Sequence, residues 1–314
     1  MDYSTNKKNP SRHYKYSICT PCFNSSKTIK MLYESLERLG FKDFEWIVVN
    51  DGSDDDTSLK IKKFIEEASF DIDFYDLNEN KMVTYCYNFL VKKSKGEFLI
   101  LLDHDDMIKQ NALDRFNFYL DSLNIPQDKK IAGIISNCDD ENGNLVGTPF
   151  PDSPFVDGFF EIMFDHGVRG EKFFCYKTEI MKEFNFPLED KYVPESTVMW
   201  NISSKYKTIF INESLRTYVL PQKESNNLSF LNRLDYSEGF RFNYLELLNR
   251  HGNKLVSRPY LALAFSFNYL FLSFNTSNFF RLFSDIKQKY LKFFALVLYL
   301  PVLTYWYIRT TFSE

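Results

Sequence analysis

Short apolar runs alternate with helical patterns up to Leu123, and this alternation restricts the fold more than any other feature of the chain. Four runs have the length of strands, at 16–20, 44–49, 71–77 and 98–102. Each is followed by a segment in which apolar residues recur every three or four positions, as on one face of a helix. Regular alternation of this kind builds a doubly wound parallel sheet with right-handed crossovers. The sequence therefore predicts an α/β fold with a mostly parallel central sheet flanked by helices.

Polar residues cluster directly after each of these runs, at 20–24, 50–53, 78–81 and 103–106. The carboxyl ends of parallel strands meet at one edge of a sheet, where open α/β sheets bind their ligands. The last cluster holds Asp103, Asp105 and Asp106, and three neighbouring acids repel one another unless a cation lies among them. Carboxylate oxygens suit Mg²⁺ or Mn²⁺. We therefore expect a metal-dependent site for an anionic ligand such as a phosphate compound.

Several classes of function are excluded by what the sequence lacks. Neither G-x-G-x-x-G nor G-x-x-x-x-G-K-[ST] occurs, which argues against a dinucleotide-binding enzyme and against a P-loop NTPase. The formal charge of -4 gives no basic footprint, so nucleic acid is not expected as a partner. Cys19 and Cys22 form an isolated C-x-x-C without a second pair, which favours reduced thiols in a cytoplasmic protein over a zinc or redox site.

The second half of the chain has a different pattern. Strand-like segments at 131–136, 172–176 and 207–211 are separated by loops rich in Pro, Gly and Asp, and we expect them to form the second wall of the site. Two helix ends are also predicted. Gly40 stands where a C′ glycine would end the first helix, and Pro194 opens a later helix that is expected to hold Met199, Ile202 and Tyr206 on its inward face.

These patterns predict four regions. Residues 1–14 form a polar tail, 15–125 and 126–235 form two halves of one domain, and 236–314 form a helical, aromatic-rich extension.

A resemblance to a known family rests on six segments in a fixed order. They are T-P-C-F-N (20–24), V-V-N-D-G-S-D-D-D-T (48–57), N-E-N (78–80), L-L-D-H-D-D (101–106), F-P…Y-V-P-E-S (186–196) and Y-K-T-I-F-I-N-E-S-L (206–215). Together they resemble the inverting family-two nucleotide-sugar glycosyltransferases of the GT-A fold, and among these the bacterial enzymes that assemble surface polysaccharides. The resemblance covers roughly residues 14 to 230, and it implies that 15–125 is the nucleotide-binding half and 126–235 the acceptor-side half of the same domain. It implies a metal-dependent, hexosyltransferase-like enzyme that uses Mn²⁺ or Mg²⁺.

The resemblance also implies roles for residues at matching positions. The nucleotide pocket would be lined by Thr20, Pro21 and Asn24. Asp51 would hydrogen-bond the base, commonly uracil. The nucleoside and phosphates would be approached by Asn80 and Lys81. In the D-x-D segment, Asp103 would face the ribose or a metal-bound water and Asp105 would ligate the metal, so both are predicted metal-site residues.

Inverting transfer also needs a base that takes the proton of the acceptor hydroxyl. Glu195 matches the acceptor-side acid of the family and is the predicted base. An acid is also favoured at a helix start by the helix dipole, whatever its function. Glu189 and Asp190 are the rivals, since the family segment often reads as two adjacent acids. Asp106 is expected to act as a helix cap or turn residue as readily as a ligand.

The chain departs from the processive synthases of this superfamily, because it has neither a Q-x-x-R-W box nor several transmembrane helices. The resemblance therefore points to transfer of one sugar, with a UDP-sugar as donor and a saccharide, which could be lipid-linked, as acceptor. Two alternatives stay open. One is a nucleotidyltransferase or sugar-nucleotide pyrophosphorylase, and the other is a non-catalytic, membrane-associated scaffold.

The apolar segment 293–308 carries no charge, is flanked by Lys292 and Arg309, and contains Pro301. Sixteen residues are short of the roughly 20 that span a bilayer. The aromatic residues and basic flanks favour a segment that lies in the membrane interface, and a buried helical hairpin is the alternative. We thus expect a cytoplasmic protein. If the segment lies in the membrane interface, the protein is expected to be peripheral to the cytoplasmic face of the inner membrane.

Overall fold

The computed structural model describes residues 3–7, 12–219, 232–276 and 282–312. The chain divides into two compact units. The first contains Met1–Asn185 and Lys205–Gln222, and the second contains Phe186–Ser204 and Lys223–Glu314. The segment Phe186–Ser204, which the predicted ranges assign to the acceptor-side half, therefore groups with the carboxyl-terminal helices.

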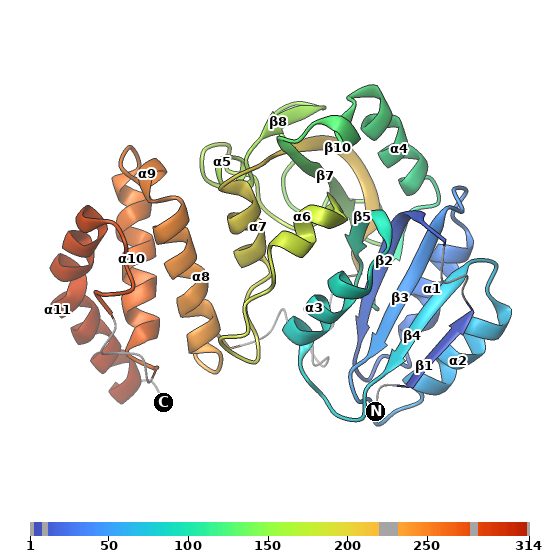
Figure 1. The fold of residues 1–314 in the computed structure, drawn as a ribbon. Helices are drawn as coiled ribbons and strands as arrows, with labels where there is room; N and C mark the ends of the chain where they lie inside the picture. Colours follow the sequence, from blue (N-terminus) through green and yellow to red (C-terminus); the bar gives the residue numbers. More distant parts are fainter. Residues whose placement is uncertain (1–2, 8–11, 220–231, 277–281, 313–314) are drawn as a thin grey trace. The chain divides into compact units, whose positions relative to one another are not determined.

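One sheet is the framework of the first unit (Figure 1). Its order is β1-β4-β3-β2-β5-β9-β7-β10-β6, and β8 pairs with β10 outside this path. The strands are β1 (Tyr3–Lys7), β2 (Tyr14–Cys22), β3 (Phe44–Asn50), β4 (Asp71–Asp76), β5 (Gly96–Leu101), β6 (Met107–Ile108), β7 (Ile131–Asp139), β8 (Phe155–Asp157), β9 (Lys172–Lys177) and β10 (Lys207–Thr217).

The centre of the sheet is parallel, as the alternation predicts. The neighbours β4, β3, β2 and β5 run in one direction, and β10 is parallel to β7. Strand β9 enters between β5 and β7 in the opposite direction. It is not the product of a strand–helix–strand crossover, so the alternation of the first half did not predict its place between β5 and β7. The α/β prediction is confirmed, with antiparallel strands added to a parallel centre.

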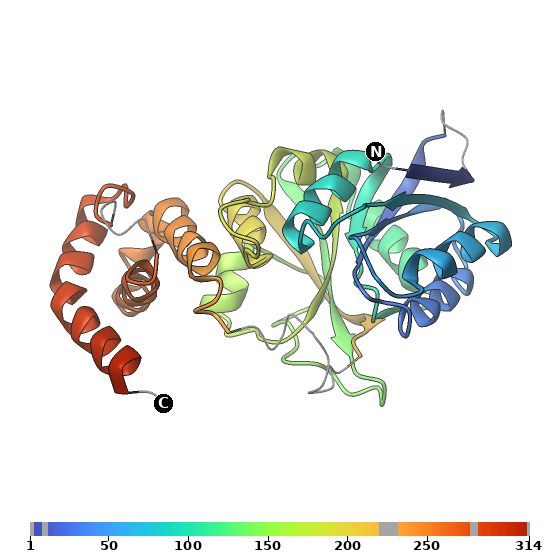
Figure 2. The same cartoon turned by 90° about the horizontal axis from the view of Figure 1, so that it is seen from below.

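Helices cover both faces of the parallel strands (Figure 2). One face carries α1 (Ile29–Glu37), α2 (Thr57–Glu67) and α4 (Ala112–Ser122), and the other carries α3 (Val83–Lys93) and α6 (Thr178–Glu183). The short elements η1 (Ile125–Gln127) and α5 (Phe159–Phe164) complete the first unit. Aromatic side chains fill much of the core, and the Tyr33 and Phe64 rings of α1 and α2 stack at 4.1 Å. Such a pair contributes about 0.5–1.5 kcal/mol beyond the area that it buries.

Two predicted helix ends are wrong. Helix α1 ends at Glu37 with Arg38 as its cap, three residues before Gly40. Helix α7 (Ser196–Ser203) ends before Tyr206, whose hydroxyl donates to Glu183 at 2.8 Å. In both cases the apolar spacing continued past the last helical residue. Such spacing shows which side of a helix is buried, but it does not show where the helix ends.

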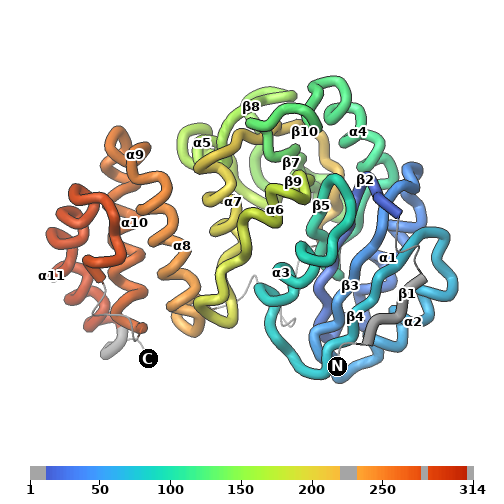
Figure 3. The backbone as a smooth tube through the Cα atoms, in the orientation of Figure 1, coloured from blue at the N-terminus to red at the C-terminus, as the bar shows by residue number. Residues whose placement is uncertain are grey.

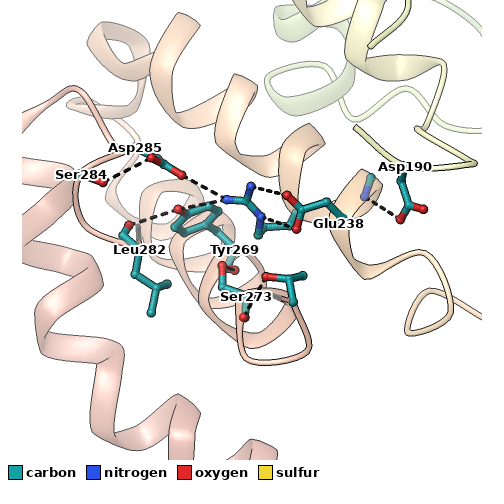
Figure 4. A network of polar contacts seen from close by, with 10 residues as sticks. Asp190, Glu238, Tyr269, Ser273, Leu282, Ser284 and Asp285 are labelled. Carbon is teal, nitrogen blue, oxygen red and sulfur yellow. Dashed lines mark hydrogen bonds and ion pairs between the residues drawn. The ribbon is translucent and has the colours of Figure 1, made fainter. Parts of the chain in front are cut away.

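The second unit is helical (Figure 3). Besides α7 it contains α8 (Ser237–Arg250), α9 (Gly252–Leu255), α10 (Pro259–Ser273) and α11 (Lys289–Phe312). Helix α10 contacts both α8 and α11. A buried ion-pair network links these parts: Arg241 of α8 pairs with Glu238 at 2.7 Å and with Asp285 at 3.4 Å (Figure 4).

Candidate functional site

The four polar clusters lie at the carboxyl ends of adjacent strands. They follow β2, β3, β4 and β5, which are neighbours in the order β4-β3-β2-β5 and run parallel. The topology therefore places the four polar clusters at one edge of the sheet, as the sequence predicts.

Gly52 brings the loops after β3 and β4 into contact. Its φ is +68°, and a Cβ atom at this position would lie 2.5 Å from the backbone carbonyl carbon of Glu79. Only glycine fits so close a backbone approach with a left-handed conformation. The consequence is that the residues on either side of Gly52 lie against the segment that follows β4.

Asp51 is held at this contact. It is buried, and its Oδ1 accepts the backbone N–H of Lys81 at 2.7 Å. Burial raises the pKa of Asp51, while the N–H of Lys81 and the thiol of Cys86 oppose this rise by hydrogen bonding to the carboxylate. The side chain is thus a fixed acceptor at the end of β3.

The three residues predicted to line the nucleotide pocket differ in exposure. Thr20 is fully buried, and its hydroxyl accepts the indole N–H of Trp46 at 3.0 Å. Pro21 is buried within β2, which runs on to Cys22. Asn24 is exposed, has a φ of +50°, and accepts the N–H of Asp54 at 3.1 Å. Of these three, Asn24 alone presents its side chain to solvent.

Asn80 and Lys81 are both exposed after β4. The Asn80 side chain accepts the N–H of Met82 at 2.9 Å, which fixes the turn into α3. The Lys81 ammonium pairs with Glu79. The backbone of Lys81 is therefore fixed by Asp51, while its charge stays at the surface.

The D-x-D turn follows β5. Asp103 and Asp105 are both partly exposed, and the Tyr87 hydroxyl donates to Asp103 at 3.2 Å. Burial, and then the nearby charge of Asp105, raise the pKa of Asp103. His104 lies within 2.8 Å of the Thr28 hydroxyl through Nδ1. The turn therefore presents two carboxylates that disfavour each other's charge, and a cation would relieve this repulsion.

Asp106 differs from its two neighbours because it is buried, with 1% of its surface exposed. Its backbone N–H closes the turn on the Asp103 carbonyl at 3.2 Å, and its Oδ1 accepts the N–H of Val219 at 3.2 Å. Burial raises its pKa to about 7 although the Arg216 guanidinium lowers it. Asp106 thus lies beneath the turn. In the part of the chain that the structure describes, no group of three or more His, Cys, Asp or Glu residues is arranged to hold a metal ion.

Glu195 belongs to the second unit, as the N-cap residue of α7. It is partly exposed, and its carbonyl accepts the N–H of Val198 at 3.0 Å. Its rival Asp190 lies in the same unit, where its carboxylate accepts the N–H groups of Gly239 at 3.1 Å and Lys191 at 2.7 Å (Figure 4). Asp190 is therefore engaged by the main chain, and the role of Glu195 stays a prediction.

Three residues of this region were not predicted from the sequence: Tyr87, Thr28 and Arg216. Tyr87 follows Cys86 on α3, and nothing in its local sequence distinguishes it from the neighbouring apolar and aromatic residues. Arg216 lies near the end of β10, and its burial depends on an ion pair with Asp106, which is over a hundred positions away in the sequence. The segment Asn227–Ser229, which resembles a donor-covering segment of the family, lies outside the described residues. All five cysteines are buried, and no disulfide joins any two of them.

Comparison with known proteins identifies part of the chain. Residues 17–125 match the family model described as Glycosyl transferase family 2. A poly-beta-1,6-N-acetyl-D-glucosamine synthase of Staphylococcus aureus is 30% identical over 138 residues, which are 43% of this chain and 32% of the synthase. A teichoic acid poly(glycerol phosphate) polymerase of Staphylococcus epidermidis is 29% identical over 110 residues, 35% of this chain and 15% of the polymerase. The chain thus matches a third or less of the length of these relatives.

Solved structures extend the likeness in fold to nearly the whole chain. Residues 1–349 of S. aureus TarS, in complex with UDP-GlcNAc, superpose with a TM-score of 0.64 at 19% identity, over 94% of this chain and 81% of that one. A mannosyltransferase from Pyrobaculum calidifontis, in complex with GDP-Man and Mn²⁺, gives a TM-score of 0.53 at 14% identity, over 96% and 86% of the two chains. These glycosyltransferases have the GT-A fold. Residues 17–125 therefore match the Glycosyl transferase family 2 model, and the chain shares the GT-A fold of these solved structures over most of its length.

Proposed function

We propose that the protein is an inverting glycosyltransferase, which transfers a single sugar from a nucleotide-diphosphate donor to a saccharide acceptor in bacterial surface polysaccharide synthesis. A UDP-sugar is the proposed donor. The observation that carries the proposal is that Asp51 and the D-x-D turn follow parallel strands at the same edge of the sheet, within the segment that matches family 2. Named relatives that make surface polymers, and a similar fold with bound UDP-GlcNAc, support the pathway and the donor.

Asp51 and the loop around it supply recognition of the nucleoside in this proposal. A buried carboxylate that is held by a backbone N–H keeps one orientation, so it can accept a hydrogen bond from the N–H edge of uracil. Exposed Asn24 and Asn80 flank the same strand ends and would contact the ribose or the phosphates.

The D-x-D turn fits a divalent cation. Asp103 and Asp105 offer partly exposed carboxylate oxygens, and their mutual repulsion is what a bound cation would offset. The two side chains would hold Mn²⁺ or Mg²⁺ together with the oxygens of the donor diphosphate. Bound there, the cation would stabilise the negative charge that grows on the leaving nucleotide.

Glu195 is the proposed base for the acceptor hydroxyl. A carboxylate on the acceptor side can take this proton as the glycosidic bond forms, and such a base contributes about 10²–10⁴-fold to a rate. Its place at the start of α7 keeps its backbone fixed by the helix.

Helix α11 supports a peripheral membrane location. Its apolar residues are exposed along one side, as shown by Phe293, Leu296, Val297, Leu300 and Ile308, each more than half exposed. Leu291, Ala295 and Val302 on the other side are buried. Lys289–Arg309 is also long and apolar enough to cross a membrane by length and composition, which is weak evidence by itself. A helix with one packed side and one exposed apolar side suits contact with a bilayer surface, where a lipid-carried acceptor would be found.

Replacing one D-x-D carboxylate tests the nucleotide site. We expect Asp105→Ala to lose the Mn²⁺-dependent part of UDP binding, because the cation loses a ligand while the nucleoside contacts remain. Isothermal titration with UDP, with and without Mn²⁺, measures this. Wild-type protein should be stabilised by UDP and Mn²⁺ in thermal unfolding, by about 2.7 kcal/mol when free UDP is 100 times Kd.

The matched control is Asp121→Ala, which removes an exposed acid from α4. Equal affinities in Asp105→Ala and wild type would contradict the metal assignment. If wild-type protein binds no nucleotide or nucleotide sugar in the same assay, the non-catalytic scaffold becomes the better description.

A further inference from the structure

Arg216 is a buried cation beneath the D-x-D turn. Only 6% of its surface is exposed although it carries a full charge at the end of β10. Its guanidinium lies 3.4 Å from Asp106 Oδ2 and 3.2 Å from Glu171 Oε2. Among the described residues, it is the one cation within 4 Å of the Asp106 carboxylate. A charge buried in this way is costly unless it is paired, so the contact is a specific one.

The same residue also holds the turn through the backbone. Arg216 pairs with Ile108 of β6, the short strand that leaves the D-x-D turn, and the N–H of Lys109 donates to the Leu215 carbonyl at 3.0 Å. The carboxylate of Asp106 in turn accepts the N–H of Val219 just beyond β10. The turn and the end of β10 are thus tied by backbone pairing and by one side-chain ion pair.

Asp106 lies directly next to the two carboxylates that face solvent. Its N–H donates to the Asp103 carbonyl, so any movement of Asp106 moves the turn that carries Asp103 and Asp105. Asp106 Oδ2 has no hydrogen-bond partner among the described residues, which leaves its ion pair with Arg216 as the interaction that holds this oxygen.

We propose that Arg216 is a positioning residue for the nucleotide site: through Asp106 it fixes the turn on which Asp103 and Asp105 bind the cation and the donor diphosphate. This inference rests on the proposed function. Arg216 lies outside the segments that resemble the family, and its loss would lower the affinity for metal-bound nucleotide as well as the stability of the fold.

Four variants test the proposal: Arg216→Gln, Arg216→Lys, Asp106→Asn and the double variant Arg216→Gln/Asp106→Asn. Loss of a residue that supports metal ligands typically costs about 10- to 100-fold in metal affinity. We expect a loss of this size in the Kd of UDP measured with Mn²⁺, and a small change without Mn²⁺. Arg216→Lys should recover part of the loss, because lysine keeps the positive charge. The recovery should be incomplete, because lysine lacks the planar guanidinium that contacts both carboxylates.

The double variant separates positioning from general damage. Because both residues act through one contact, its affinity should be no lower than that of the weaker single variant. The matched control is Arg115→Gln, which breaks the ion pair between α4 and Glu213 of the same strand β10. It should lower the melting temperature without changing the Mn²⁺-dependent affinity.

Each outcome decides the proposal. If wild-type protein binds UDP with Mn²⁺ and folded Arg216→Gln binds it equally well, the proposal is wrong even if the melting temperature falls. If Arg216→Gln does not fold, the isosteric Asp106→Asn decides in the same way. If wild-type protein itself binds no nucleotide, the proposed function has failed and this inference fails with it.

Discussion

Individual acids at the strand ends differ in what surrounds them. Asp51 and Asp106 are buried and held by backbone N–H groups, whereas Asp103 and Asp105 are partly exposed and face each other's charge. A buried, hydrogen-bonded carboxylate keeps its orientation, and a partly exposed pair of carboxylates can ligate a cation. The sequence showed four similar aspartates, and their division into supporting and binding groups depends on burial that only tertiary structure sets.

Glu195 is tested by an isosteric change. We expect Glu195→Gln to bind UDP and Mn²⁺ as wild type does, while sugar transfer falls by about 10²–10⁴-fold because no base remains for the acceptor hydroxyl. Binding is measured by titration calorimetry and transfer by release of the nucleotide. The comparison variant is Asp190→Asn. Full transfer in Glu195→Gln together with a collapse in Asp190→Asn would move the base to Asp190.

At the scale of elements, hydrophobic spacing predicted which segments are helices and strands better than where they end. The strands predicted at 131–136, 172–176 and 207–211 are β7, β9 and β10, each extended by at least one residue. Strand β10 runs six residues further, to Thr217, because it pairs with β7 and β6 along its length. Pairing partners far along the chain set such ends, so local patterns cannot give them. The same reason explains why Arg216 was missed.

The contact between two loops is tested at Gly52. Gly52→Ala should lower the free energy of unfolding by about 1–3 kcal/mol from the left-handed backbone alone, and by more because the new Cβ would meet the backbone of Glu79 and Asn80. It should also weaken UDP binding, since Asp51 and Lys81 lie on the two loops. Urea unfolding and titration calorimetry measure the two effects.

Gly143→Ala is the matched control for this change. Gly143 also has a positive φ, of +81°, but a Cβ there would meet no atom within 4 Å. The difference between the two variants therefore isolates the close approach of the loops. Equal losses of stability would show that backbone conformation alone requires glycine at position 52.

For the whole molecule, the sequence predicted the first unit more fully than the second. The parallel strands and their polar ends followed from local alternation, and the solved structures confirm the GT-A fold. The second unit takes the segment Phe186–Ser204 from the middle of the chain and joins it to helices that begin at Ser237. Its polar contacts, such as the one between Asn243 and the Thr197 hydroxyl at 2.9 Å, link residues 46 positions apart. No local sequence pattern predicts a unit assembled from segments so far apart in the chain.

Membrane association is tested on the exposed side of α11. Ending the chain near residue 290 should release the protein from membranes, but it also removes buried Leu291 and Ala295. Leu296→Glu/Leu300→Glu is the sharper change, because both side chains are more than 60% exposed and charge opposes entry into the interface. We expect this variant to stay in the supernatant when wild-type protein sediments with lipid vesicles.

Leu59→Glu is the control, since Leu59 is 68% exposed on α2 of the first unit. It should sediment with vesicles as wild type does. If the α11 variant also sediments unchanged, the exposed face of α11 does not bind membranes, and a second protein surface becomes the better candidate for its partner.

The strand β1 has one more consequence, for the behaviour of the protein at high concentration. It pairs with β4 over Tyr3–Lys7 and so occupies what would otherwise be an open edge of the sheet. At the far end of the sheet path, β6 is only two residues long. Open, long edges are where sheets of separate molecules join and aggregate. The path of the described sheet ends in a strand of five residues on one side and a strand of two residues on the other, and such short edge strands limit growth by strand addition.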